Sequence, residues 1–256
     1  MDIALKIILI TLGVIIGLIL LVVLVFFGSA LFVNPKKEYV KPNKYYAFVL
    51  EMTHRTLFTL GNIRVKTVGK EKLPSGRFLL VSNHRSAYDP LCTWVSMHER
   101  EITFISKEEN LKKPFIGRWG KRLGCLPIDR EDPRKAIKTI NRAAELIAED
   151  KLSMGVYPEG TRSVGAELLD FHNAVFKIAQ KAKVPIVVMT IDGSEKIKKR
   201  FLFRRTNVYI TIADVIDTEF VINNGTKEIG ERAKNSMINA LSNNKIKNNK
   251  IIKNNK

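Results

Sequence analysis

The sequence predicts an α/β fold: a mixed central sheet flanked by helices, preceded by an N-terminal membrane helix. Short apolar runs rich in β-branched residues alternate along the chain with segments whose apolar residues recur at helical spacing. The run Val184–Ile191 is apolar on both faces, as expected of a central strand that helices cover on both sides. A chain of 256 residues has room for one such domain and a short appendage.

The first thirty-odd residues predict a transmembrane or membrane-embedded helix within 1–34. Ile7–Phe27 is apolar except for Thr11 and two glycines, which is long enough to cross a hydrocarbon core of about 30 Å. A signal peptide is the weaker alternative, because its apolar core is usually about 7–15 residues long. Only Lys6 precedes the span, whereas Lys36, Lys37, Lys41 and Lys44 follow it. This asymmetry places the domain on the cytoplasmic side of the cell membrane.

Three further segments complete the predicted organisation. Residues 35–61 read as a linker and an interfacial helix, with His54 and Arg55 at its surface. The α/β domain occupies 62–241. Its predicted strands are Ile63–Val68, Phe78–Ser82, Ile102–Ser106, Leu126–Ile128, Ser153–Tyr157, Val184–Ile191 and Leu202–Ile212. One predicted helix starts at Pro90, and three others cover Pro133–Asp150, Phe171–Lys183 and Lys227–Leu241. Residues 242–256, rich in Asn and Lys and without an acid, predict a disordered tail that is drawn to anionic surfaces.

Composition limits the partners and the chemistry. A formal charge of +18 favours anionic partners and leaves nucleic acid, anionic lipid and phosphorylated metabolites open. Cys92 and Cys125 lie far apart and outside any CxxC pattern, so neither a zinc site nor a disulfide framework is expected.

The stretch FLLVSNHRSAYDP (78–90) predicts a strand, a turn and a helix that Asp89 caps and Pro90 begins. The turn presents His84 near the Asp89 carboxylate. An imidazole oriented by a carboxylate can take a proton from a hydroxyl near neutral pH. No Gly-x-Ser-x-Gly elbow supplies a nucleophile, so we interpret His84 as a base acting on the substrate's own hydroxyl. The alternative is an exposed histidine beside a capping aspartate.

Two more polar segments follow predicted strands. Arg130 ends the run after Leu126–Ile128, where its planar fork suits a phosphate; the alternative is a surface Asp-Arg pair. The loop PEGTR (158–162) follows the strand Ser153–Tyr157, at the end of the sheet where α/β proteins bind ligands. There Glu159 and Arg162 are candidates to position a polar head group, unless they only form an ion pair that holds the turn.

The order of these segments carries a resemblance. NHRSAYD, LPIDR, YPEGTRS and VPIVV, in that order, resemble the four successive motifs of the PlsC-type glycerolipid acyltransferases, and KEENLKKPFIG resembles the approach to the second motif. This family includes 1-acyl-sn-glycerol-3-phosphate acyltransferase. The match runs from about Phe78 to Thr190. It implies a glycerolphosphate-acyltransferase-like fold.

The resemblance also implies a reaction. His84 would deprotonate the sn-2 hydroxyl of a lysophosphatidic acid, Asp89 would orient His84, and the hydroxyl would attack an acyl thioester directly to give phosphatidic acid. Backbone donors of the His84 turn would stabilise the oxyanion, and VPIVV would line the acyl or thioester site. The expected phosphate and glycerol contacts are Arg130, Glu159, Gly160, Thr161, Arg162 and Lys107. Acyl-carrier protein or coenzyme A would carry the acyl group, and no metal or other cofactor is expected.

Three alternatives remain open at this stage. The acceptor could be glycerol 3-phosphate or another lysolipid, or the same pair could serve a membrane-bound thioesterase or hydrolase. A membrane-tethered nucleic-acid binder would suit the charge, but the basic residues are dispersed and are not interleaved with aromatic residues. We therefore expect no nucleic-acid partner and an anionic membrane surface instead.

Overall fold

The structure is a computed structural model and describes residues 2–40, 43–163, 165 and 167–254. Lys41 and the last two residues of the predicted tail lie outside this range.

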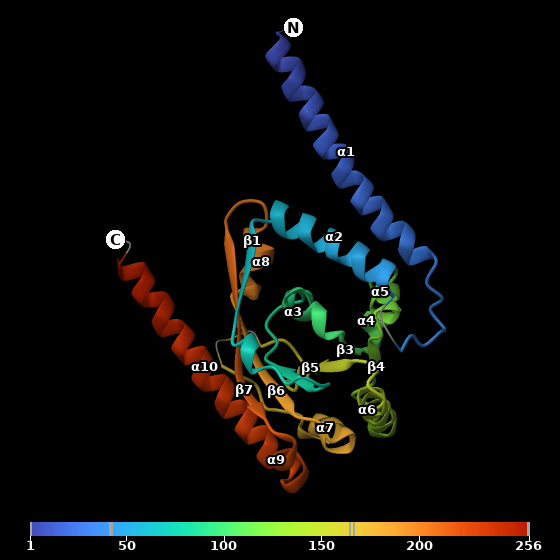
Figure 1. The fold of residues 1–256 in the computed structure, drawn as a ribbon, viewed down its shortest axis with the longest axis vertical. Coiled ribbons are helices and arrows are strands. Elements are labelled where there is room, and N and C mark those ends of the chain that lie inside the picture. The colour runs from blue at the N-terminus through green and yellow to red at the C-terminus, as the bar shows by residue number, and fades with distance from the viewer. Residues whose placement is uncertain (1, 41–42, 164, 166, 255–256) are drawn as a thin grey trace.

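A seven-stranded sheet forms the centre of the domain, in the order β1-β7-β6-β2-β5-β3-β4 (Figure 1). The strands are β1 (Ile63–Val68), β2 (Leu79–Ser82), β3 (Ile102–Lys107), β4 (Leu126–Ile128), β5 (Ser153–Val156), β6 (Ile186–Asp192) and β7 (Thr206–Ile216). Only the β6–β7 pair is antiparallel among these strands, and the other neighbours are parallel. The predicted mixed sheet is therefore confirmed.

Helices cover both faces of the sheet. The long ones are α1 (Ile3–Leu31), α2 (Lys44–Leu60), α3 (Asp89–Met97), α6 (Pro133–Ala148) and α10 (Thr226–Asn254). The short ones are α4 (Glu108–Lys112), α5 (Ile116–Arg122), α7 (Lys177–Ala182), α8 (Ile197–Arg200) and α9 (Thr218–Asn223). Helices α6, α7 and α10 pack on one face of the sheet, and α2, α3 and α8 pack on the other.

The alternation of side chains along each strand explains this three-layer arrangement. In β2, Leu79 and Val81 join the core under α6 and α7, whereas Leu80 joins the core under α2 and α3. In β6, Val188 faces the first core and Val187 the second. The continuous apolar run of this central strand is thus buried on both sides, as the sequence predicts.

Three sequence predictions differ from the structure. The last strand begins at Thr206, because a turn, and not a strand, follows α8. His54, expected at the surface, is buried between the rings of Phe58 and Trp94, because α2 packs on the domain as well as following the membrane helix. Helix α10 continues to Asn254, beyond the predicted start of a disordered tail at 242. No glycine or proline follows Gly230, and lysine is a good helix former, so nothing in the sequence ends this helix earlier.

Helix α1 is the one helix of the described residues that is long and apolar enough to cross a membrane. Most of it projects away from the domain, but its C-terminal end is packed against α2 and α5 (Figure 1). Trp119 of α5 stacks on Phe26 with ring centroids 4.6 Å apart, and its indole nitrogen donates to the Phe26 carbonyl. Ser29 and Ala30 are buried at the same junction. The projecting helix therefore leaves the domain in a defined direction.

Candidate active site

The predicted site segments follow the carboxyl ends of four neighbouring parallel strands. His84 follows β2, Glu159 follows β5, Lys107 ends β3 and Arg130 follows β4. Parallel strands carry their carboxyl ends to the same edge of a sheet, and neighbours lie about 4.8 Å apart, so the β2 and β4 ends are separated by about 14 Å. Side chains reaching inward from the two ends bring these segments to one site.

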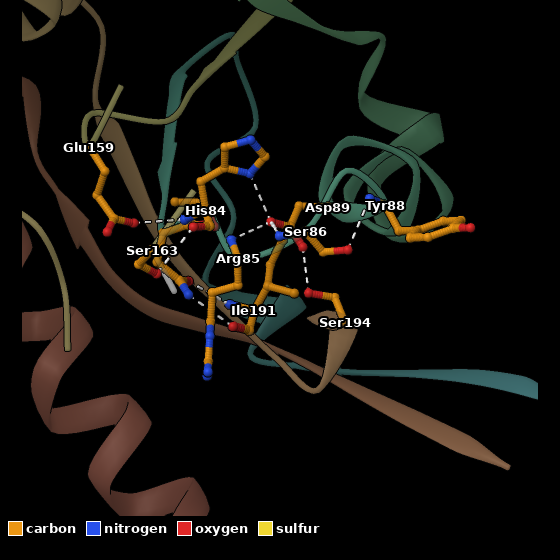
Figure 2. A network of polar contacts seen from close by, with 11 residues as sticks. His84, Arg85, Ser86, Tyr88, Asp89, Glu159, Ser163, Ile191 and Ser194 are labelled. Atoms are coloured by element: carbon orange, nitrogen blue, oxygen red, sulfur yellow. Dashed lines mark hydrogen bonds and ion pairs between the residues drawn. The ribbon is translucent and has the colours of Figure 1, made fainter. Parts of the chain in front are cut away.

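His84 and Asp89 form a hydrogen-bonded pair at the centre of this edge (Figure 2). His84 Nδ1 lies 2.8 Å from Asp89 Oδ2. The same oxygen accepts hydrogen bonds from the backbone amides of Arg85 and Ser86, both at 2.7 Å. An oxygen that accepts from two amides is an acceptor for the imidazole too, so Nδ1 carries the proton and Nε2 presents its lone pair. Figure 2 shows Nε2 on the side of the ring away from Asp89.

The Asp89 carboxylate is fully buried and satisfied by hydrogen bonds. Its second oxygen accepts from the hydroxyl of Ser194, which follows β6. His84 is 19% exposed and its partner is 0% exposed. A buried carboxylate with all these donors holds the imidazole in one orientation and stabilises positive charge on it.

The turn that carries His84 is held by two other parts of the chain, the PEGTRS loop (158–163) and β6. The His84 amide donates to Glu159 Oε1 at 2.7 Å, and the His84 carbonyl accepts from the Ser163 amide at 2.9 Å. Asn83, also fully buried, exchanges two hydrogen bonds with the backbone of Ile191 at 2.9 and 2.8 Å. The third motif and the strand that carries the fourth therefore support the turn of the first.

Tyr157 supports the imidazole from one face. Its ring stacks on His84 with centroids 4.3 Å apart and an angle of 23° between the planes, and it also stacks on Phe104. Burial, and secondarily the Asp89 carboxylate, raise the pKa of Tyr157 well above its usual value. The phenol therefore stays protonated and acts as an apolar platform beneath the base.

Among the predicted phosphate contacts, Gly160 and Arg130 lie next to each other, and Thr161, Arg162 and Lys107 are exposed. Gly160 has a φ of +70°, and a Cβ there would lie 2.8 Å from the His172 ring and 3.9 Å from the Arg130 guanidinium. Arg130 thus reaches the PEGTR loop. Thr161 and Arg162 are exposed beside it, and Lys107 is exposed and ion-paired with Glu109 at 3.2 Å.

Comparisons with known proteins identify the family. The acyltransferase family model matches residues 64–192, just over half of the 256 residues. The chain belongs to the acyltransferase family. It is 29% identical to the 1-acyl-sn-glycerol-3-phosphate acyltransferase of Saccharomyces cerevisiae over 181 residues, which cover 69% of this chain and 59% of that enzyme. It is 37% identical to a chloroplastic 1-acyl-sn-glycerol-3-phosphate acyltransferase of Brassica napus over 131 residues, 50% of this chain and 37% of the relative.

A crystal structure supports the fold of this acyltransferase. The structure of PlsC, the 1-acyl-sn-glycerophosphate acyltransferase of Thermotoga maritima, superposes with a TM-score of 0.62 at 20% identity and covers 87% of this chain and 91% of that one. The predicted PlsC-type family and glycerolphosphate-acyltransferase-like fold are thus confirmed. The matches span about half the length of several curated relatives.

Two sequence-based interpretations of the acyltransferase site change with the structure. The amides of His84, Arg85 and Ser86 already donate to carboxylates, so this part of the turn has no free donor for an oxyanion. The side chains of Ile186, Val187 and Val188 in the fourth motif are buried in the core, so their strand reaches the site through the backbone of Ile191, beyond the motif, and these side chains do not line it.

Glu159 also takes a different place from the one expected of a head-group ligand. It is 2% exposed, and its second oxygen accepts from the Leu169 amide at 2.9 Å. Both oxygens of this carboxylate are thus used within the acyltransferase itself. Among the described residues, no three His, Cys, Asp or Glu side chains gather as metal ligands do.

Sequence reasoning missed three residues of the site. Asn83 directly precedes His84, and Tyr157 lies two residues before Glu159, so their positions in the motifs were a usable signal. Ser194 had none, because it lies 105 residues from Asp89 and only the finished sheet brings the two together.

Proposed function

We propose that this acyltransferase moves a fatty acyl group from an acyl thioester to the sn-2 hydroxyl of 1-acyl-sn-glycerol 3-phosphate and so makes phosphatidic acid. The observation that carries this proposal is the buried Asp89 carboxylate holding His84 with its Nε2 lone pair available. The names of the relatives supply the substrate class, since both enzymes cited by sequence are 1-acyl-sn-glycerol-3-phosphate acyltransferases.

The geometry supports direct transfer without an acyl-enzyme. His84 Nε2 takes the proton of the sn-2 hydroxyl while the hydroxyl oxygen attacks the thioester carbonyl. The tetrahedral intermediate collapses by breaking the carbon–sulfur bond, and the imidazolium returns the proton to the leaving thiolate. Asp89 stabilises the imidazolium between these steps. The two serines nearest the base in sequence both have engaged hydroxyls: Ser82 donates to the Asn83 carbonyl, and Ser86 accepts from the Tyr88 amide.

The phosphate of the acceptor would lie at the β4–β5 side of the site. We place Arg130 and Arg162 on its oxygens, with Thr161 and the Gly160 backbone beside them and Lys107 at the end of β3. Arginine always carries its charge in proteins and can bind two phosphate oxygens at once. Burial lowers the pKa of Arg130 from its ordinary value, and Glu109 opposes this effect.

The acceptor and the product are lipids, and the chain has structures suited to reach them. We propose that α1 crosses the cell membrane and that the domain lies on the cytoplasmic side. Helix α2 is apolar on two opposite faces: one packs into the core, and the other exposes Tyr45, Phe48, Met52 and Leu60. This outward face would rest on the bilayer, so α2 acts as the predicted interfacial helix.

The test is acyl transfer from labelled acyl-coenzyme A and from acyl-acyl-carrier protein to lysophosphatidic acid in vesicles. We expect phosphatidic acid from the intact protein, a loss of kcat of about 10²-fold or more in His84→Ala, and mainly a raised KM for the acceptor in Arg162→Ala. Arg64→Ala, an exposed arginine on β1 at the far edge of the sheet, is the matched control.

Two results would contradict the proposal. Full activity of His84→Ala would exclude the imidazole as the base. Consumption of thioester without formation of phosphatidic acid would point to the thioesterase, or to another acceptor such as glycerol 3-phosphate.

A further inference from the structure

The end of α8 and the turn that follows it, residues 198–205 and here called the 198–205 turn, expose more apolar surface than a soluble face requires. Its sequence is KKRFLFRR. Phe203 is 86% exposed and Leu202 is 62% exposed. Outside α1, the other large apolar side chains of the described residues that are at least 62% exposed are Phe32, Phe48 and Ile116, which follow α1 or lie on α2 and α5; Val68 and Ile137 come next at 57% and 56%, on β1 and α6.

The turn is held in place. The amides of Phe203 and Arg204 both donate to the Arg200 carbonyl at 2.9 Å, and Leu202 adopts a φ of +67°. Phe201 points inward, where its ring lies against Gly61 at the end of α2 so closely that a Cβ there would lie 2.5 Å from it. The two neighbouring apolar side chains therefore point outward because the backbone directs them there.

The position of the turn relates it to the membrane helix. Helix α2 begins beside α1 and α5 and ends beside this turn, and its 17 residues place those two points about 25 Å apart at 1.5 Å per residue. In Figure 1 the turn between α8 and β7 lies at the far end of α2, on the side of the domain from which α1 projects. The apolar outer face of α2 connects the two.

The charges around the two apolar side chains are all of one sign. Lys198, Lys199, Arg204 and Arg205 are exposed. Within the part of the chain that the structure describes, none of these four forms an ion pair. Large apolar side chains between basic ones are the pattern by which peripheral segments enter the headgroup region of anionic bilayers.

We propose that the 198–205 turn is a second membrane contact, in which Leu202 and Phe203 enter the headgroup region of an anionic bilayer while the four flanking cations bind lipid phosphates. The turn and α1 then hold the domain at two points, one at each end of α2. Two contacts separated by the length of α2 restrict the tilt of the domain on the membrane more than the packed end of α1 does alone. The surface could also suit an acidic protein, but the outward apolar side chains and their continuity with α2 favour lipid.

The test places a fluorophore at the turn in the full-length protein. Phe203→Cys is labelled with a nitrobenzoxadiazole group and reconstituted in phosphatidylcholine vesicles containing about one-third phosphatidylglycerol, with or without nitroxide on the lipid acyl chain. Cys92 is buried, and burial raises the pKa of both native thiols, so they stay protonated and unreactive. Ile222→Cys on α9 is the matched exposed control, and Leu18→Cys reports the span.

We expect lipid nitroxide to quench position 203 at least about twofold more than position 222. The quenching at position 203 should no longer depend on phosphatidylglycerol once the four cations are neutralised. The variant combines Lys198→Gln, Lys199→Gln, Arg204→Gln and Arg205→Gln. Equal quenching at 203 and 222 with strong quenching at Leu18→Cys would overturn this proposal and leave the membrane span intact. If the fluorophore at position 203 were shielded from water only when acyl-carrier protein is added, whatever the lipid composition, the turn would bind a protein partner. That result would also overturn the proposal. Absence of quenching at all three positions would refute the span and this second contact together.

Discussion

Replacing Asp89 by asparagine separates the charge of this residue from its geometry. Asp89 Oδ2 accepts from His84 Nδ1 and from the amides of Arg85 and Ser86. The two amides require an oxygen at this position, so the asparagine carbonyl takes it and its amino group faces the Ser194 hydroxyl, which can accept. His84 therefore keeps its proton on Nδ1. The variant loses the negative charge beside the imidazolium and little else.

The expected loss of kcat follows from the distance between the Asp89 carboxylate and the His84 imidazolium. Two unit charges about 4 Å apart attract by about 4 kcal/mol at an effective dielectric constant near 20. Part of this remains as a neutral hydrogen bond, so we expect kcat to fall about 10²- to 10³-fold, since each 1.4 kcal/mol is about tenfold in rate. The KM for the acceptor should change little. The assay is initial-rate acyl transfer to lysophosphatidic acid in vesicles, with thermal unfolding recorded in parallel.

Asp89→Ala is the contrasting variant. It leaves the amides of Arg85 and Ser86 buried without an acceptor, which costs about 1–3 kcal/mol for each group. We expect this variant to unfold at a clearly lower temperature than Asp89→Asn. If Asp89→Asn retained kcat within about tenfold of the intact protein, stabilisation of the imidazolium by the Asp89 charge would not explain the rate. If it were as unstable as Asp89→Ala, the assumed carbonyl orientation would be wrong.

Substitutions at three further residues test the support of the site. Glu159→Gln should lower the free energy of unfolding by about 2 kcal/mol, because one of its two backbone donors then faces an amino group; equal denaturant midpoints would refute this. Tyr157→Phe should leave kcat unchanged, because the buried hydroxyl lies beside Thr93 and supports His84 only through the ring, whereas Tyr157→Ala should lower kcat about tenfold by freeing the His84 ring; equal rates would exclude the stacking role. Gly160→Ala should cost about 1–2 kcal/mol for its left-handed backbone and raise the acceptor KM by displacing His172; an unchanged KM would place the phosphate elsewhere.

The sequence predicted the elements that depend on local pattern. The strand Ile63–Val68 and the short strand Leu126–Ile128 have the predicted bounds. The central strand was recognised because its run is apolar on both faces, and the helix from Pro133 was recognised because its apolar residues recur at helical spacing; the structure adds that Asp132 caps this helix. These features depend on neighbouring residues alone. Turn 198–205 misled the strand prediction, because FLF resembles a strand when the flanking turn geometry is unknown.

The candidate site was predictable in its members but not in their contacts. His84 and Asp89 pair as expected, since five residues and one turn separate them. Glu159 was selected for the right motif but given a ligand's role, because a single sequence does not show that its carboxylate is buried against backbone amides. The same reason hid the occupied amides of the His84 turn.

The catalytic turn is held by residues that are far away in the chain. Its contacts join it to Glu159, 75 residues away, to Ser194 and to Ile191, 108 residues away. Contacts of such long sequence separation form late, because their loop-closure entropy is lost before they contribute stability. A growing or partly folded chain that has completed β2 but lacks β5 and β6 thus has a histidine without an oriented partner. We expect His84 to gain its ability to abstract a proton only when the sheet closes around β2, so that the proposed acyl transfer would report the completion of folding.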